Sequence, residues 1–373
     1  MRFKIPAGKL KESKFQYLDE VIQSRHVNPI LQGILFDVKN NILSLSATDL
    51  DVFAIISIDG IEVDQEGGAV ITDKIIDVIK SLPDDLDIEF DKKGDRVEIK
   101  TSKGKYTFSC FTAEDFPQIF AKDDNMLVKC SISGQVLRDV ISSIIYIVPD
   151  QHKSYYTSLA GILFDISDSE INFVGSDSYR LIKMTKDVKM LNKVANLSVI
   201  VPKDALNILL KFLGDNDIEI ELNSRHIIFK SESFTIISRL IDEKYPSYQK
   251  ILQIDVDKDA IFDRESLLSA IKRVLIFSDK SSMRVNFEFN QDNLVLTAND
   301  DSGNSIKENL ECIYRSKNFQ ITFNPKFIYD ILRHVKSEKI LFKFGRSDQP
   351  AYIKPFGDDS DDLITVVMPM KGE

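Results

Sequence analysis

The sequence predicts an α+β protein made of three copies of one strand-rich unit, each with two helices, because two patterns recur in one register. The first pattern is an alternating strand that runs into an acidic turn, and the three turns carry Asp49, Asp177 and Asp300. The second is a strand end, a lysine and an apolar-periodic helix, and the three lysines are Lys74, Lys203 and Lys326. The aspartates are 128 and 123 residues apart and the lysines 129 and 123, so both patterns mark the same repeat.

Each unit is expected to open with an amphipathic helix, because apolar residues recur at the spacing of one helical face over residues 9–23, 134–147 and 264–277. A second helix follows each repeated lysine. A strand then follows that helix, over residues 86–90, 218–222 and 340–344. Two further strands of period two, residues 96–101 and 105–111, flank the turn Ser102-Lys103-Gly104 and predict a hairpin.

The units end in similar proline-containing segments, which are Asp115-Phe116-Pro117, Tyr245-Pro246-Ser247 and Met368-Pro369-Met370. Charged stretches follow the first two of these endings. We therefore expect three domains, over residues 1–124, 125–256 and 257–373.

The composition is that of an ordinary globular protein, with 43% hydrophobic and 28% charged residues. No apolar run approaches the roughly 20 residues of a membrane span, and the first residues lack an apolar signal core. The three cysteines are far apart, which excludes a disulfide framework and favours the cytoplasm. The net charge of −10 argues against tight, non-specific binding of nucleic acid by the surface as a whole.

A search for catalytic chemistry finds one candidate. The four histidines are scattered and phosphate-binding glycine loops are absent, so no metal or nucleotide site is predicted. The alternative is a metal-dependent hydrolase that uses Asp49 with Asp51, or Asp300 with Asp301. These aspartates sit at corresponding turns of the repeat, however, where aspartate commonly accepts hydrogen bonds from backbone amides. We therefore interpret them as turn residues.

Six segments, in their order and spacing, resemble the bacterial DNA polymerase III β subunit family, the sliding clamps. They are Asn28-Pro29-Ile30-Leu31, Asp115-Phe116-Pro117, Ser176-Asp177-Ser178-Tyr179-Arg180-Leu181, Val201-Pro202-Lys203, Tyr245-Pro246-Ser247-Tyr248 and Val367-Met368-Pro369-Met370. The resemblance covers the whole chain. It implies a clamp fold and a head-to-tail homodimer, whose six domains close a ring around duplex DNA with helices lining the hole.

The resemblance also implies the function. Such a ring has no catalytic residues, cofactor or metal; it tethers the replicative polymerase for processive DNA replication and is a docking platform. The implied partners are double-stranded DNA, a second copy, the DNA polymerase III catalytic subunit, the clamp loader, and other polymerases and repair proteins that carry a short clamp-binding peptide.

Three sets of site residues follow from the resemblance. The residues expected to face DNA are Arg25, Lys74, Arg138, Tyr155, Tyr156, Lys203 and Lys326. The pocket for the partner peptide is expected to contain Leu159, Ser176, Ser178, Tyr179, Arg180, Leu181, Pro246, Lys250, Ile251, Val366, Met368 and Met370. The dimer interface is expected to contain Tyr106, Phe108, Ile276 and Phe277.

This chain departs from the family pattern within the pocket. Ser178 and Tyr179 stand where the family commonly has glycine and histidine, and Lys250 stands in place of an arginine. We expect these differences to alter the shape of the pocket and its preference among peptides.

Overall fold

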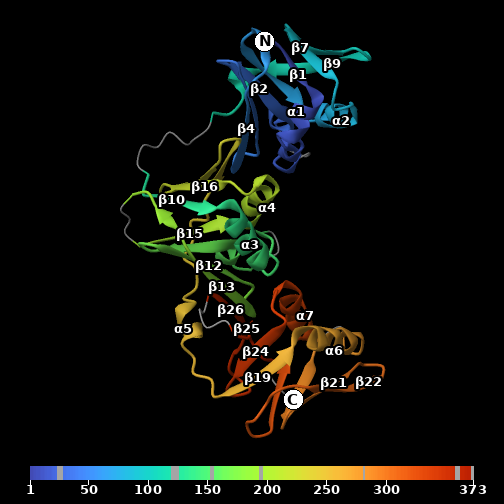
Figure 1. Ribbon diagram of the computed structural model, residues 1–373, viewed down its shortest axis with the longest axis vertical. Coiled ribbons are helices and arrows are strands. Elements are labelled where there is room, and N and C mark those ends of the chain that lie inside the picture. The colour runs from blue at the N-terminus through green and yellow to red at the C-terminus, as the bar shows by residue number, and fades with distance from the viewer. Residues whose placement is uncertain are drawn as a thin grey trace. The chain divides into compact units, whose positions relative to one another are not determined.

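The chain folds into two compact units, which Figure 1 traces from the N-terminus in blue to the C-terminus in red. The computed structural model describes residues 1–22, 28–118, 126–151, 155–192, 196–279, 282–357 and 362–370. The first unit comprises Met1–Asp139, Val188–Asn196 and Val201–Asp242, and the second comprises Val140–Asp187, Leu197–Ile200 and Glu243–Glu373. The central repeat therefore contributes strands to both units, and the domain boundaries at 124 and 256 remain predictions.

The first unit is built on one sheet of 14 strands. In spatial order they are β14 (Lys189–Met190), β10 (Val128–Ser133), β16 (Asp217–Leu222), β17 (His226–Lys230), β18 (Phe234–Arg239), β4 (Val52–Ile58), β3 (Ile42–Thr48), β2 (Gly33–Lys39), β6 (Gly67–Thr72), β9 (Gly104–Thr112), β8 (Arg96–Thr101), β7 (Asp87–Lys93), β1 (Arg2–Pro6) and β5 (Glu62–Gln65). The predicted hairpin is confirmed, because β8 and β9 pair antiparallel with Thr101 opposite Gly104.

The helices of this unit are short. They are α1 (Ala7–Glu12), η1 (Phe15–Glu20), η2 (Pro29–Gln32), α2 (Lys74–Ser81), η3 (Ala113–Asp115) and α4 (Lys203–Phe212). The single helix predicted over residues 9–23 is wrong, because Lys14 has a left-handed backbone with φ 64° and interrupts it. The Lys14 amine instead donates to the carbonyls of Phe212 and Leu213, at 3.0 and 3.2 Å, where α4 ends.

Two segments that carry the family resemblance pack against each other. Asn28 caps η2 by accepting a hydrogen bond from the Ile30 amide at 3.3 Å. Ile30 and Leu31 then form a small buried cluster with Phe116 and Val70. The first segment therefore contributes to the burial of Phe116 in the second segment, which ends the first repeat.

The second unit contains two sheets. The eight-stranded sheet has the order β15 (Leu197–Pro202), β11 (Gly161–Ile166), β12 (Glu170–Ser176), β13 (Arg180–Asp187), β26 (Leu363–Val367), β25 (Ala351–Pro355), β24 (Lys339–Phe344) and β19 (Lys258–Asp263). The four-stranded sheet has the order β22 (Ser305–Glu311), β21 (Asn293–Asn299), β20 (Val285–Asn290) and β23 (Phe319–Phe323).

The helices of the second unit are η5 (Thr157–Leu159), α5 (Gln249–Leu252), α6 (Arg264–Ile276) and α7 (Pro325–His334), while α3 (Gly134–Ile144) leads the chain in from the first unit. Two of them, α6 and α7, lie where the sequence predicted them, whereas η5 and α5 were not predicted. In the third repeat α6 packs against α7. Their apolar faces and the inner faces of both sheets enclose one core, in which Phe289 and Phe344 lie 4.4 Å apart between ring centroids.

Successive repeats are joined by main-chain pairing of strands. In the first unit β4 pairs antiparallel with β18, and Ala54 lies opposite Ile236. In the second unit β13 pairs antiparallel with β26, and Ile182 lies opposite Thr365. The strand after the acidic turn of one repeat thus pairs with the last strand of the next repeat.

The acidic turns share one pattern of side-chain capping, and the third turn is one residue longer than the first two. Asp49 accepts from the amides of Asp51 and Val52, and Asp177 accepts from those of Tyr179 and Arg180. Asp300 likewise accepts from the amides of Ser302 and Asn304. Each turn contains a residue with a left-handed backbone, and these residues are Leu50 (φ 78°), Ser178 (φ 77°) and Gly303 (φ 85°). The hydrogen bonds support the interpretation of the aspartates as turn residues.

Candidate partner groove and DNA-facing surface

An apolar groove of about 210 Å³ lies in the second unit, where the second and third repeats meet. It is lined by Ser176, Ser178, Tyr179, Arg180, Leu181, Ile251, Ile254, Pro350, Val366 and Met368. The groove exists because β13 pairs with β26, which brings Leu181 directly opposite Val366. Most of the residues predicted for the pocket therefore come together from segments that are far apart in the sequence.

One wall of the groove is held by a buried arginine. The Arg180 guanidinium lies 2.9 Å from a carboxylate oxygen of Asp177 and 3.1 Å from one of Asp330 on α7. It also lies 4.4 Å from the centre of the Phe327 ring. Only 8% of Arg180 is exposed, so these contacts replace its hydration and fix the wall. The Asp177 carboxylate also acts on Tyr245: burial is the main cause that raises the pKa of the Tyr245 hydroxyl, and the nearby Asp177 carboxylate raises it further.

Tyr179 forms the rim of the groove. Its ring stacks against Phe327 with centroids 5.9 Å apart, and 60% of the residue remains exposed. Its carbonyl accepts a hydrogen bond from the Met368 amide at 2.8 Å, which ties the rim to the C-terminal segment. The preceding residue, Ser178, adopts the left-handed backbone that glycine adopts without steric cost.

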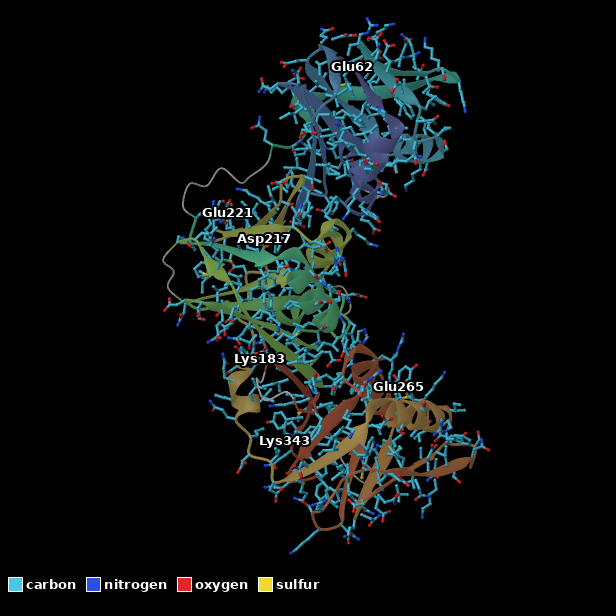
Figure 2. The ribbon with its side chains drawn as sticks, viewed as in Figure 1. Glu62, Lys183, Asp217, Glu221, Glu265 and Lys343 are labelled. Atoms are coloured by element: carbon cyan, nitrogen blue, oxygen red, sulfur yellow. The ribbon has the colours of Figure 1, made fainter. Side chains whose placement is uncertain are left out.

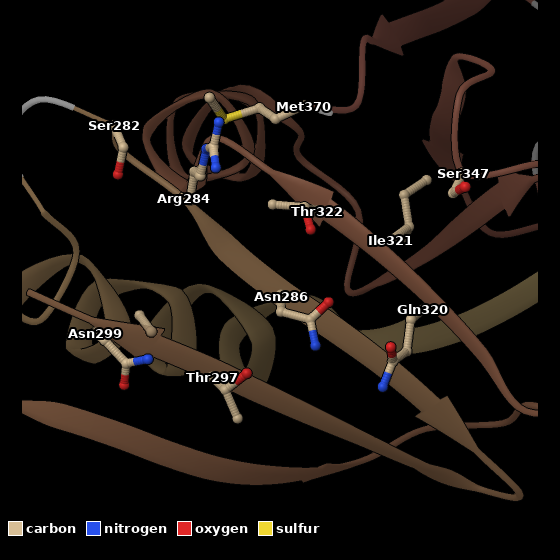
Figure 3. A pocket seen from close by; sticks show the side chains of 11 residues that line it. Ser282, Arg284, Asn286, Thr297, Asn299, Gln320, Ile321, Thr322, Ser347 and Met370 are labelled. Atoms are coloured by element: carbon tan, nitrogen blue, oxygen red, sulfur yellow. The ribbon is translucent and has the colours of Figure 1, made fainter. Parts of the chain in front are cut away.

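Four predicted pocket residues are not among those that line the groove. Leu159 lines a neighbouring hollow, together with Tyr155 and Tyr156. Met370 lines a polar hollow on the four-stranded sheet, beside Arg284 (Figure 3). Pro246 and Lys250 line neither the groove nor these two hollows. Ile254 and Pro350 line the groove but were not predicted from the sequence. Both are apolar; Ile254 lies near the segment 245–248, and Pro350 directly precedes β25, so their positions could have indicated a place in the groove.

The three repeated lysines lie at the first turns of α2, α4 and α7. A cation at a helix N-terminus opposes the helix dipole, so these positions do not favour lysine for stability. Arg138 is engaged elsewhere, because it donates to the Leu213 carbonyl at the end of α4. Arg25 falls outside the described residues.

The residues predicted for the dimer interface lie on one strand and at one helix end. Tyr106 and Phe108 share one face of β9 and are partly buried, while Ile276 at the end of α6 is 75% exposed. Phe277 follows Ile276 and packs partly against the core.

Charged side chains surround both units, and Glu62, Asp217 and Glu265 are examples labelled in Figure 2. In the part of the chain that the structure describes, no three side chains of metal-binding type gather in one place. No helix among the described residues is long and apolar enough to cross a membrane.

The fold defines a class of protein in which repeated domains are joined by strand pairing and carry an apolar groove where two repeats meet. Family models of the DNA polymerase III beta subunit match the chain, with the N-terminal domain at residues 1–120, the central domain at 131–247 and the C-terminal domain at 249–371. The chain belongs to this family, and the predicted clamp fold is confirmed.

Individual relatives agree along the whole chain. The beta sliding clamp of Pseudomonas aeruginosa is 28% identical over 360 residues, which cover 95% of this chain and 96% of the relative. That of Vibrio cholerae is 26% identical and covers 100% of both chains. The crystal structure of the DNA polymerase III subunit beta from Pseudomonas aeruginosa superimposes with a TM-score of 0.94 at 26% identity, covering 100% of both chains.

These findings establish the function as that of a sliding clamp, a ring that encircles duplex DNA and tethers the replicative polymerase for processive synthesis. The prediction of a clamp is confirmed. Nothing in the relatives or in the arrangement of Asp49, Asp51, Asp300 and Asp301 supports the alternative of a hydrolase.

Proposed function

We propose that two copies of this chain close a ring of six repeats, without catalytic residues, in the cytoplasm. The observation that carries this proposal is the strand pairing that joins repeats within the chain. β4 and β13 each follow an acidic turn, and each pairs with the last strand of the next repeat. The corresponding strand of the third repeat is β22, and the corresponding last strand of the first repeat is β9.

Both of these strands have an edge available. β22 is the outer strand of the four-stranded sheet. β9 pairs with β8 on one edge over residues 104–109, and with β6 on its other edge only over residues 110–112. Among the described residues, the edge of Gly104–Ser109 therefore faces no neighbouring strand. We propose that β22 of one copy pairs antiparallel with β9 of another, which repeats the joint for a third time and closes the ring.

The register of this pairing follows from the repeat. Ala54 and Ile182 lie opposite Ala47 and Gly175 in their hairpins, and Ile306 lies opposite Ala298. The second strand of each joint also pairs with a neighbour in its own repeat. There, Ile236 lies opposite the buried Phe229, and Thr365 lies opposite the buried Ile353. Tyr106 lies opposite Ile99 in the same way. We therefore expect Ile306 to lie opposite Tyr106 of the second copy.

The helix ends support the same arrangement. In the first unit Tyr17 of η1 meets Phe212 of α4 edge-on, with ring centroids 6.1 Å apart. In the second unit Tyr146 stacks on His334 of α7 at 3.6 Å. At each joint, the first helical segment of one repeat thus contacts the second helix of the next repeat. At the ring seam, we expect the corresponding contact between Ile276 at the end of α6 and α2 of the other copy.

Lys74, Lys203 and Lys326 are the proposed contacts to DNA, since sequence-independent attraction to phosphates holds a duplex without fixing its position. Arg25, Arg138, Tyr155 and Tyr156 remain predicted contacts. The groove is the proposed docking site for the polymerase catalytic subunit, the clamp loader and other polymerases and repair proteins. A relative from Pseudomonas aeruginosa has been crystallised bound to griselimycin, which supports ligand binding by this fold.

The proposal is tested by retention on DNA. A ring that encloses a duplex stays on closed circular DNA and is lost when the circle is cut, because its link is topological. A clamp loader places the protein on nicked circular DNA. Retention of the protein on the DNA is measured by gel filtration before and after the circle is linearised. Cross-linked circles serve as the reference. Equal retention on circular and linear DNA would contradict the ring.

A further inference from the structure

The joint between the first and second repeats has the same framework as the joint that carries the partner groove. The Arg239 amide donates to the Asp51 carbonyl at 2.9 Å, and the Met368 amide donates to the Tyr179 carbonyl at 2.8 Å. Each of these contacts continues the pairing of a strand that follows an acidic turn with the last strand of the next repeat. Arg239 therefore has at the first joint the position that Met368 has beside the groove.

Each of these joints also carries three buried side chains in a row, at positions that lie opposite one another on three adjacent strands. At the groove the three are Leu181, Val366 and Tyr352. At the first joint the three are Phe53, Ile237 and Ile228, and we call them the first-joint floor. None of the six residues is more than 6% exposed. The floor of the groove thus has an apolar counterpart in the first unit.

Strand pairing of this kind does not itself call for an apolar floor. At the register proposed for the ring seam, the corresponding residues are Ser305, Thr107 and Glu98, which are polar. A floor that is apolar at the groove and at the first joint therefore points to a property that these two joints share beyond the pairing.

The two joints differ in what lies against the floor. At the first joint Met126, two residues before β10, packs against the first-joint floor and is itself partly buried. At the other joint the chain between the second and third repeats supplies Ile251 and Ile254, which line the groove. Their carbonyls accept hydrogen bonds from the Tyr352 hydroxyl at 2.6 and 3.3 Å. The floor is thus in contact with the chain's own methionine at the first joint, whereas at the second it belongs to an open groove.

We propose that the first joint is a second site for an apolar peptide side chain, and that Met126 keeps it closed by occupying the place of that side chain. This inference rests on the proposed function of the groove as a peptide site. Methionine and leucine have similar volumes, and methionine adapts to irregular surfaces, so a leucine of a peptide can replace Met126. The rim differs, because Asp51 and Arg239 form an exposed ion pair at 3.4 Å where the groove has Tyr179 and Met368. We therefore expect the second site to bind more weakly than the groove.

The test titrates the full-length protein with a short, otherwise polar peptide that ends in two leucines, one of them photoreactive. Calorimetry gives the number of peptides bound per chain, and mass spectrometry of the cross-links locates them. The unchanged protein should bind one peptide per chain, at the groove. Met126→Ala should bind a second one at the first-joint floor, at least about tenfold more tightly than the unchanged protein does there. Met126→Leu, which keeps the volume, and Leu127→Ala, which changes an exposed neighbour, should still bind one.

Other outcomes would overturn the inference. If Met126→Ala is less stable to denaturant but still binds one peptide, Met126 only packs against the fold. A second peptide that cross-links away from Phe53, Ile228 and Ile237 would place the site elsewhere. In the unchanged protein, a large excess of peptide should shift the methyl resonance of Met126 in NMR spectra, and a resonance that stays in place would contradict the inference without relying on a variant. Binding to neither protein would contradict the groove together with this inference. Binding to Met126→Ala alone, at the first-joint floor, would support this inference and contradict the groove.

Discussion

Ala54 in β4 lies directly opposite Ile236 in β18, so the joint between the first two repeats is an uninterrupted run of main-chain pairing. The pairing of Ile182 with Thr365 repeats it one domain later. Because the same relationship occurs twice within one chain, the third occurrence that we propose between two chains has an expected register, which can be tested residue by residue.

The first prediction concerns the ring seam. Ile276→Asp places a charge in an apolar contact, and losing the burial of one such side chain costs about 2 kcal/mol, which is about thirtyfold in the dimer dissociation constant. Sedimentation velocity over a dilution series measures the change. Ile313→Asp is the matched control, because Ile313 is also exposed in the third repeat, at 48%, but lies outside the proposed seam. A dimer of unchanged strength in Ile276→Asp would contradict the seam.

The second prediction concerns the repeated lysines. Replacing Lys74, Lys203 and Lys326 singly by glutamine should weaken DNA association modestly and lower the slope of log K against log salt by about one for each. Stability should stay the same or rise by up to about 1 kcal/mol, because each lysine opposes a helix dipole. Lys39→Gln, at the exposed end of β2, is the control. A loss of stability without a change in salt slope would show that these lysines stabilise the fold and do not contact DNA.

The third prediction concerns the groove. Met368→Ala removes apolar lining and should weaken a partner peptide by about 1–2 kcal/mol, roughly five- to thirtyfold, while ring formation survives. Met370→Ala is the matched control, because Met370 lies two residues away but lines the polar hollow (Figure 3). Pro246→Ala, which changes no residue of the lining, should have little effect. Equal losses in all three variants would mean that the groove extends beyond the residues described.

The fourth prediction concerns backbone strain at the rim. Ser178→Gly should raise the free energy of unfolding by about 0.5–1 kcal/mol, because glycine adopts a φ of 77° without a steric penalty. Leu50→Gly, with φ 78° in the corresponding turn, should do the same. Only Ser178→Gly should also change peptide affinity, since Leu50 lies in the first unit. Chemical denaturation and peptide titration distinguish the two effects, and destabilisation of both variants would show that the turns need these side chains.

The repeat was predictable because it depends on periodic apolar positions and on aspartates that accept from nearby amides. The break at Lys14 was not, because the carbonyls that its amine contacts, those of Phe212 and Leu213, are supplied by another repeat. The groove was predicted only by resemblance. Its residues come together through the pairing of β13 with β26, and no local pattern in the sequence indicates which strands meet across a joint. Arg138 shows the same limit, because its carbonyl partner lies 75 residues away.

The joints β4–β18 and β13–β26 differ from the proposed seam in one physical respect. Inside the chain, each pair of strands is held at a high effective concentration by the polypeptide that connects them. The proposed pairing of β22 with β9 of another copy has no such connection. Dilution therefore acts on this joint alone, and any force that opens the ring acts first where covalent continuity is missing.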